Sequence, residues 1–311
     1  MDKNLIRCLP ESVADALRRA AALYGETVDE IRMYRNGNAV LVVSGRNIKT
    51  SLVCTEEMLR QTIGNLCGHS LYAHEESLRQ GFIFTKDGIR VGVAGRAVCT
   101  GERIERVTDL ASLCIRIPRR YPGTADDILP YAVCGGVPAS LLIFSPPGMG
   151  KTTALRELAY LLAKSSYRVA VIDTRYELGY GISGEFLDIF RGYSRPLGME
   201  MAIRVMNPQF VICDEISTEA DGKAVLQCAS SGVAVIASAH GGSPEDLCRQ
   251  AGLAAPFGHG VFRTLVQLHR KDGQLVHTFY YDKGGAWIRA DGRIGTSGGS
   301  CHCGGDPIAD G

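Results

Sequence analysis

The chain has 311 residues, more than one hydrophobic core usually organises, so we expect two domains. Its 34 Lys and Arg nearly balance its 33 Asp and Glu, and a formal charge of +1 argues against a general attraction to nucleic acid or anionic membrane. No segment approaches the ~20 apolar residues of a spanning helix, which predicts a cytoplasmic protein that reaches a membrane only through a partner.

The eleven cysteines are scattered along the chain, and several lie inside apolar runs. This pattern is typical of small buried side chains in a reducing compartment. Cys301-His302-Cys303 is the densest group, but it lacks the second pair of ligands that a tetrahedral zinc site needs. We interpret it as part of a disordered tail in preference to a metal site.

The first 125 residues combine short helices and strands. Helical spacing runs from residue 11 to 25, a strand follows at residues 38–45, and Thr55 is the expected N-cap of a helix that ends near residue 68. Residues 81–98 predict a β-hairpin, with Asp87-Gly88 as its turn. We interpret residues 1–125 as a small α+β N-terminal domain.

The pattern changes after "RIPRRYPGTADDILP", where three prolines interrupt regular structure and mark the domain junction. Four short apolar runs then alternate with helical stretches: "SLLIFS", "RVAVIDT", "QFVICDE" and "VAVIAS". Such strands belong to a parallel sheet covered by helices on both faces. The predicted fold class is α/β, with a RecA-like P-loop domain over residues 126–283 and a Gly-rich, disordered tail over residues 284–311.

A phosphate-binding signature, "SPPGMGKT", begins at Ser145, which replaces the usual first Gly with another small residue. Its glycines allow backbone N–H groups to converge on phosphate oxygens, and a helix N-terminus follows. Lys151 is expected to reach the β- and γ-phosphates of ATP, and Thr152 to ligate Mg²⁺. The predicted nucleotide-binding residues here are Pro147, Gly148, Met149, Gly150, Lys151, Thr152 and Thr153.

The apolar strand "FVICDE" ends in two carboxylates. Asp214 fits the residue that holds Mg²⁺ through water, so Thr152 and Asp214 are the predicted metal ligands. Glu215 can orient and polarise an attacking water, which hydrolysis needs and a small-molecule kinase does not. The alternative role of Glu215 is that of a solvated strand end.

Two further strands are expected to end at the same edge of the sheet. "VAVIDTRYE" places Asp173, Arg175 and Glu177 there, which makes Glu177 the rival of Glu215 for activating water. "VAVIASAH" places His240 there, either as a sensor of the γ-phosphate or in a structural role. The predicted catalytic residues are Glu215, Lys151, Glu177 and His240.

Several segments, most of them outside the nucleotide signature, resemble the stage III sporulation protein AA family, itself similar to the ATPases of type II and type IV secretion. They include "SLYAHEESLRQGFI", "GIRVGVAGRAV", "SLCIRIPR", "GMEMAIRVMNP" and "ASAHGGSPEDL", and the resemblance runs from about residue 28 to 283. It implies a two-domain ATPase that forms a ring, expected to be a hexamer. The ring would lie in the mother cell, in the cytoplasm or peripheral to a membrane, and act with membrane proteins of a channel to the forespore.

The resemblance also implies roles for residues. Asp173 to Glu177 correspond to an acidic box, and Ala239-His240-Gly241 to a His box. Arginines of the N-terminal domain act on the nucleotide of a neighbouring subunit in the secretion ATPases; by similarity, the positions here are Arg90, Arg96 and Arg116. The acidic box of the family has an extra carboxylate where this chain has Thr174, which ranks Glu215 above Glu177 as the base.

Two other functions would use the same residues. A RecA-like ATPase that depends on nucleic acid predicts a basic stripe with interleaved aromatic residues, or an appended binding module, and the sequence shows neither. A nucleotide-gated scaffold with negligible hydrolysis requires the same phosphate-binding side chains, so the sequence leaves that function open.

Overall fold

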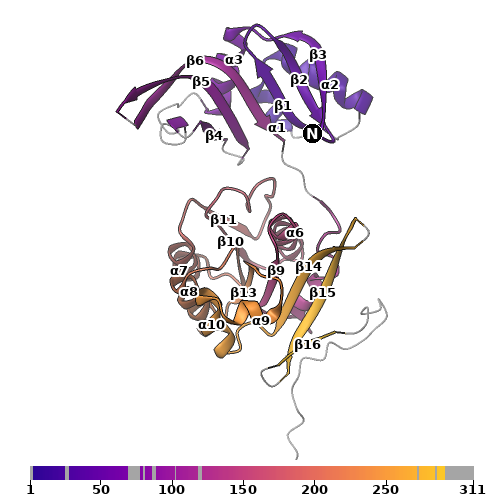
Figure 1. Ribbon diagram of the computed structural model, residues 1–311, viewed down its shortest axis with the longest axis vertical. Helices are drawn as coiled ribbons and strands as arrows, with labels where there is room; N and C mark the ends of the chain where they lie inside the picture. Colours follow the sequence, from indigo (N-terminus) through magenta and orange to yellow (C-terminus); the bar gives the residue numbers. More distant parts are fainter. Residues whose placement is uncertain are drawn as a thin grey trace, which may run out of the picture. The chain divides into compact units, whose positions relative to one another are not determined.

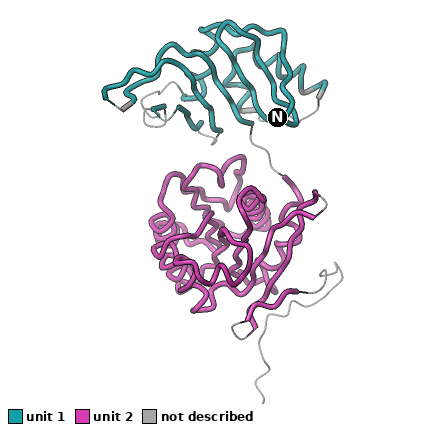
Figure 2. The backbone as a smooth tube through the Cα atoms, in the orientation of Figure 1, with its two compact units in different colours: residues 1–119 teal, residues 120–311 magenta. Residues whose placement is uncertain are grey.

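The computed structural model describes residues 3–24, 28–68, 78–79, 81–85, 89–101, 103–117, 121–271, 273–283 and 286–290. The chain divides into two compact units, Met1–Arg119 and Arg120–Gly311 (Figure 2). The turn predicted at Asp87-Gly88 and the group Cys301-His302-Cys303 lie outside the described residues.

The first unit is built on a six-stranded antiparallel sheet of order β3-β2-β1-β6-β5-β4 (Figure 1). Its strands are β1 (Val28–Tyr34), β2 (Asn38–Val43), β3 (Arg46–Val53), β4 (Phe82–Phe84), β5 (Arg90–Thr100) and β6 (Arg103–Arg116). Its helices are α1 (Lys3–Cys8), α2 (Glu11–Tyr24) and α3 (Glu56–Leu66). The Thr55 side chain accepts the N–H of Met58 at 3.2 Å, so the predicted N-cap of α3 is confirmed.

The second unit has an eight-stranded sheet of order β11-β10-β12-β13-β9-β14-β15-β16 (Figure 1). Neighbouring strands from β11 to β14 in this order run parallel, and β15 and β16 add antiparallel strands at one edge. The strands are β9 (Leu141–Ser145), β10 (Val169–Asp173), β11 (Leu187–Arg191), β12 (Phe210–Cys213), β13 (Ala234–His240), β14 (Thr264–Lys271), β15 (Gln274–Lys283) and β16 (Ala286–Arg289). A small hairpin, β7 (Val133–Cys134) and β8 (Val137–Pro138), precedes them.

Helices cover both faces of this sheet, as the apolar strand runs predicted. They are α5 (Leu129–Ala132), α6 (Lys151–Lys164), α7 (Arg195–Met206), α8 (Glu219–Ser230), α9 (Pro244–Cys248) and α10 (Ala251–Gly258). Leu155 and Leu158 of α6 are buried on one face with Ile143 of β9. Met199 of α7 and Val225 of α8 are buried on the other face with alternate residues of the same strands. Continuous burial of β9, β10 and β12 follows from this two-sided packing.

The edge of the sheet differs from the expectation in one respect. Ala286–Arg289, which we expected to belong to the disordered tail, pairs with β15 as strand β16. Trp287 packs against the hydrophobic core, and its ring lies 5.6 Å from that of Phe257. One aromatic side chain with a core contact is enough to extend the sheet into a Gly-rich segment. Residues 291–311 lie outside the described residues.

Within the described part of the chain, no helix has the length and apolar character needed to cross a membrane.

Candidate active site

The site is assembled where four parallel strands reach their carboxyl ends, at one edge of the second unit's sheet. Ser145 ends β9 and lies opposite His240, which ends β13. Asp173 ends β10, and Asp214 follows β12. Ligands of open α/β sheets bind in the crevice outside these strand ends, so the topology brings the predicted polar residues to the edge where such sheets bind ligands.

The loop between β9 and α6 has the backbone conformation that its glycines permit. Gly148 and Gly150 have φ values of +77° and +96°, in the left-handed region that L side chains rarely adopt. A Cβ at either position would meet no atom within 4 Å, so conformation rather than space requires glycine there. Helix α6 starts directly at Lys151, and its first N–H groups lack intrahelical partners. They are suited to bind an anion.

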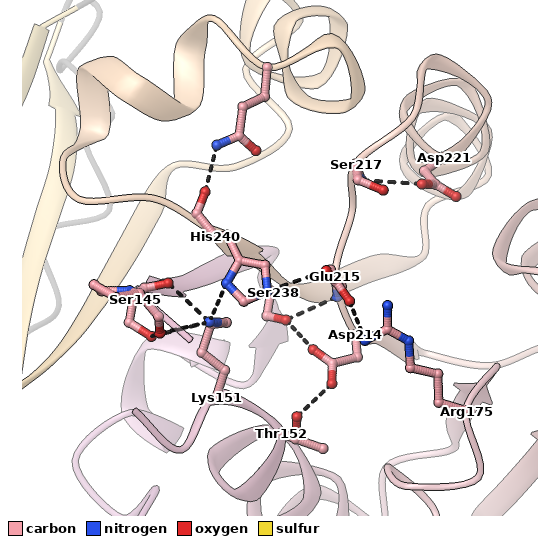
Figure 3. Close-up of polar contacts among 12 residues, drawn as sticks. Ser145, Lys151, Thr152, Arg175, Asp214, Glu215, Ser217, Asp221, Ser238 and His240 are labelled. Atoms are coloured by element: carbon pink, nitrogen blue, oxygen red, sulfur yellow. Dashed lines mark hydrogen bonds and ion pairs between the residues drawn. The ribbon is translucent and has the colours of Figure 1, made fainter. Parts of the chain in front are cut away.

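Lys151 lies folded back over this loop, with its residue only 7% exposed (Figure 3). Its Nζ donates to the carbonyl oxygens of Ser145 at 3.0 Å and Pro146 at 3.2 Å. The same nitrogen lies 3.0 Å from Nδ1 of His240. The ammonium therefore has partners inside the protein that a phosphate oxygen could replace.

Thr152 and Asp214, the two residues predicted to hold Mg²⁺, are in direct contact. Thr152 Oγ1 donates to Asp214 Oδ2 at 2.6 Å. The hydroxyl of Ser238 donates to the other carboxylate oxygen, and its Oγ accepts the N–H of Glu215 at 3.0 Å. Ser238 is fully buried in β13, so it fixes Asp214 and Glu215 together. The sequence analysis did not identify it, although a lone hydroxyl inside the apolar run "VAVIAS" was a usable signal.

These oxygen donors fit Mg²⁺, which prefers hard oxygen ligands and usually takes only one or two carboxylates from the protein. Among the described residues, no group of three or more His, Cys, Asp and Glu could hold a metal ion by itself. A hydroxyl and one carboxylate are the protein ligands expected where phosphate oxygens and water complete the coordination.

Glu215 is held between two positively polarised groups. Its Oε2 lies 2.6 Å from an Arg175 guanidinium nitrogen, and its Oε1 lies 3.2 Å from Nε2 of His240 (Figure 3). Its backbone is in the left-handed region, with φ of 56°, which is uncommon for a residue with a side chain. Burial lowers the pKa of Lys151, while the charges of Asp214 and Glu215 oppose that shift. Glu215 thus contacts His240 and lies close enough to Lys151 for their charges to interact.

Asp173 serves to shape the loop that follows β10. It is 2% exposed, and its carboxylate accepts the N–H groups of Glu177 at 2.8 Å, Leu178 at 3.1 Å and Gly179 at 2.8 Å. Glu177 itself is exposed, and its carbonyl accepts from Arg156 at 2.5 Å. All three of these carboxylate contacts are with backbone groups, so this acid holds the loop in shape.

A pocket lies between the ends of β10 and β12 and is lined by both candidate bases. Glu177 and Glu215 face it together with Asp214, Arg175 and Arg195. The Thr174 hydroxyl, which replaces the expected extra carboxylate, is buried without a hydrogen-bond partner within the described part of the protein. Because both glutamates line one pocket, the choice between them remains a prediction.

The remaining predicted residues of the phosphate loop have different surroundings. Met149 packs partly against the core beside α6. Pro147 is exposed, whereas Thr153 is half-buried in the first turn of α6. Their backbone positions, rather than their side chains, are what a phosphate would contact.

The three predicted arginines lie on adjacent strands of the first unit. Arg90 and Arg96 belong to β5, and Arg116 ends β6. Each is exposed and has a neighbour in that unit: Arg90 lies 4.5 Å from the centre of the Phe82 ring, Arg96 pairs with Asp109, and Arg116 lies 3.7 Å from a Glu30 oxygen. Weak exposed ion pairs of this kind leave a guanidinium able to exchange partners.

Comparison with known proteins gives one family. Residues 2–287 match the family described as "Sporulation stage III, protein AA". Over 294 residues the chain is 32% identical to "Stage III sporulation protein AA" of Bacillus subtilis (strain 168), a match that covers 91% of this chain and 95% of that protein.

Solved structures share the fold of both units. The ATPase DotB of Legionella pneumophila matches with a TM-score of 0.56 and 17% identity over 88% of this chain and 80% of that one. The pilus retraction motor PilT with bound ADP matches with a TM-score of 0.59 and 14% identity over 85% of this chain and 80% of that one. At these identities the likeness establishes the fold, an N-terminal antiparallel β unit followed by a mostly parallel sheet with helices.

Proposed function

The chain belongs to the sporulation stage III, protein AA family, and on this premise we propose that it is an Mg²⁺-dependent ATPase. The observation that carries the proposal is the meeting of Lys151, Thr152, Asp214 and Glu215 at the N-terminus of α6. A left-handed glycine loop, a cation, a metal-binding hydroxyl and two carboxylates are what hydrolysis of a phosphoanhydride needs.

Binding begins with the loop and helix. Backbone N–H groups around Gly148 and Gly150 hold the phosphates of ATP at the α6 N-terminus. The Lys151 ammonium exchanges the carbonyls of Ser145 and Pro146 for the β- and γ-phosphate oxygens. Thr152 and Asp214 are the residues that would hold Mg²⁺, which when bound supplies positive charge against the phosphates.

Hydrolysis then requires an oriented water. Glu215 accepts a proton from the water while the oxygen of that water forms a bond to the γ-phosphorus. The bond from the γ-phosphorus to the bridging oxygen breaks, and that oxygen leaves with ADP. Arg175 and His240 hold the Glu215 carboxylate in place through contacts of 2.6 Å and 3.2 Å. Glu177, which lines the same pocket, is the alternative proton acceptor.

We further propose that the protein works as a homo-oligomer, expected to be a hexameric ring, in the mother cell of an endospore-forming bacterium. Arg90, Arg96 and Arg116 would then stabilise transition-state charge on the nucleotide of a neighbouring subunit. The ring would power assembly of, or transport through, a channel to the forespore by acting on membrane proteins. Family membership and the two-unit fold shared with a pilus retraction motor support this part of the proposal.

The test is steady-state ATP hydrolysis at increasing protein concentration, with Arg116→Ala in parallel. We expect specific activity to rise with concentration and to collapse in Arg116→Ala. Arg106→Ala, which changes another exposed arginine of the same strand, should retain activity. Single-stranded DNA is added to one series. Specific activity that is independent of protein concentration but strongly stimulated by DNA would identify a nucleic-acid-dependent ATPase instead. ATP binding with negligible turnover under all conditions would identify a nucleotide-gated scaffold.

A further inference from the structure

Arg195 and Asp221 form an ion pair next to the candidate site, and no sequence pattern singles out either residue. Arg195 opens α7, and Asp221 lies in the first turn of α8. The guanidinium approaches the carboxylate in a two-point contact, with Nε 3.1 Å from Oδ1 and Nη2 3.3 Å from Oδ2. The side chains are only 17% and 3% exposed, so solvent screens the pair far less than an ordinary surface ion pair.

Asp221 also holds the backbone that follows Glu215. Its Oδ2 accepts the N–H of Ser217 at 3.2 Å (Figure 3). The same oxygen accepts the N–H of Thr218 at 2.9 Å. The Thr218 side chain in turn accepts the N–H of Asp221 at 3.1 Å, which closes a capping box at the start of α8. One buried carboxylate therefore sets the path of the chain directly after the candidate base.

The loop also packs closely against the backbone of α10. A Cβ on Gly252 of α10 would lie 2.8 Å from the Ser217 carbonyl carbon and 2.9 Å from the Thr218 oxygen. A Cβ on Gly222 would lie 2.5 Å from the Gly252 oxygen. The loop after Glu215 is therefore packed closely against α10 as well as held by Asp221.

Arg195 connects this loop to the segment between β11 and α7. The segment before α7 is tied to β10, because Gly192 donates its N–H to the Asp173 carbonyl at 3.0 Å. Arg195 lines the pocket shared by Glu177 and Glu215, while its guanidinium is held by Asp221. The ion pair thus connects a segment tied to the end of β10 with the first turn of α8.

We infer that Arg195 is a positioning residue: through Asp221 it fixes the Ser217–Thr218 backbone and so holds the Glu215 carboxylate in the geometry that activates water. This inference rests on the proposed function. Arg195 acts here through Asp221 and Glu215, not by contact with the phosphates.

The kinetic test compares Arg195→Met and Arg195→Lys with the unchanged protein. A misplaced base lowers kcat, and we expect a loss of about 10- to 100-fold in Arg195→Met with the KM for ATP nearly unchanged. Arg195→Lys keeps the charge but not the planar fork and should recover only part of the loss. Lys223→Met removes an exposed cation from the same helix as Asp221 and should leave kcat unaltered. All rates are normalised to the folded fraction from circular dichroism.

Hydrogen exchange without nucleotide tests the positioning separately from catalysis. The amides of residues 215–218 should exchange at least about 10-fold faster in Arg195→Met than in the unchanged protein or Lys223→Met. Unchanged exchange together with unchanged kcat would overturn the inference, as would a kcat loss that merely follows the folded fraction. If the protein without substitutions binds ATP but does not hydrolyse it, the proposed function is overturned, and with it the role of Arg195 in positioning a base. The exchange result would still decide whether Arg195 holds the loop.

Discussion

Lys151 Nζ lies 3.0 Å from Nδ1 of His240. An ammonium has only donors, so Nδ1 accepts and the imidazole carries its proton on Nε2. This N–H points to Glu215, with Nε2 and Oε1 3.2 Å apart. His240 thus connects the cation proposed to bind phosphate to the carboxylate proposed to activate water. A nucleotide that attracts Lys151 would therefore change the hydrogen bonding of Glu215 through one side chain.

This connection predicts opposite effects of His240→Ala on binding and turnover. Without His240, Lys151 loses one internal partner in the free protein, so ATP should bind up to about 5-fold more tightly, the equivalent of one hydrogen bond. Glu215 loses a donor, so kcat should fall about 10-fold. The measurements are nucleotide titration and steady-state kinetics. His259→Ala, which removes an exposed histidine of the same unit, is the matched control. Weaker ATP binding in His240→Ala would show instead that His240 contacts the nucleotide.

Lys151→Ala should abolish useful nucleotide binding. The side chain supplies the cation of the loop from a largely buried position, and its removal should weaken ATP binding by about 100-fold or more. Lys164→Ala, at the exposed end of the same helix, removes the same charge far from the loop. Calorimetric titration with ATP and Mg²⁺ distinguishes the two variants. Equal affinities would mean that the nucleotide binds elsewhere.

Glu215→Gln should separate binding from chemistry. The amide keeps the size of the side chain but cannot take a proton from water, so turnover should fall about 100- to 1000-fold while ATP still binds. Glu177→Gln changes the other glutamate that lines the same pocket, and its turnover should fall less. Single-turnover hydrolysis measures the chemical step directly. Normal turnover in Glu215→Gln with a large loss in Glu177→Gln would assign the base to Glu177.

The core of the second unit could be predicted because its signals are local. Buried parallel strands are continuous apolar runs, and "SLLIFS" and "QFVICDE" are confirmed as β9 and β12. The glycines and Lys151 of the phosphate loop belong to one short segment, so their spacing alone indicated a site. Polar residues at strand ends meet for a topological reason, which is why Asp214 and His240 could be placed at one edge of the sheet.

What the sequence could not show depends on contacts between distant residues. Arg195 and Asp221 lie 26 residues apart, and nothing in either segment indicates that they pair. Ser238 reaches Asp214 only because β13 lies beside β12. Strand β16 was missed because glycines surround it, although Trp287 gives it a place in the core. In each case a tertiary contact outweighs a weak local preference.

The charge of Asp221 predicts a pH dependence of stability. Burial raises the pKa of this carboxyl, but hydrogen bonds from Thr218, Arg195 and Ser217 together lower it below 3.8. A carboxyl whose pKa is lower in the folded protein stabilises the fold fully above the unfolded value. That contribution disappears as the pH falls from 3.8 through the folded value. Asp221→Asn, which lacks the charge at every pH, should therefore be less stable than the unchanged protein at neutral pH, by about 3 kcal/mol.

Urea unfolding from pH 7 to pH 3 measures the difference between the two proteins. We expect the difference in unfolding free energy to be constant above pH 5 and to shrink below 3.8, because only the unchanged protein gains a proton on residue 221 there. Asp246→Asn, which neutralises an exposed carboxylate in the first turn of α9, should stay within about 0.5 kcal/mol of the unchanged protein at every pH. A difference that persists undiminished to the lowest pH would show that Asp221 acts through shape and hydrogen bonds alone, without a contribution from its charge.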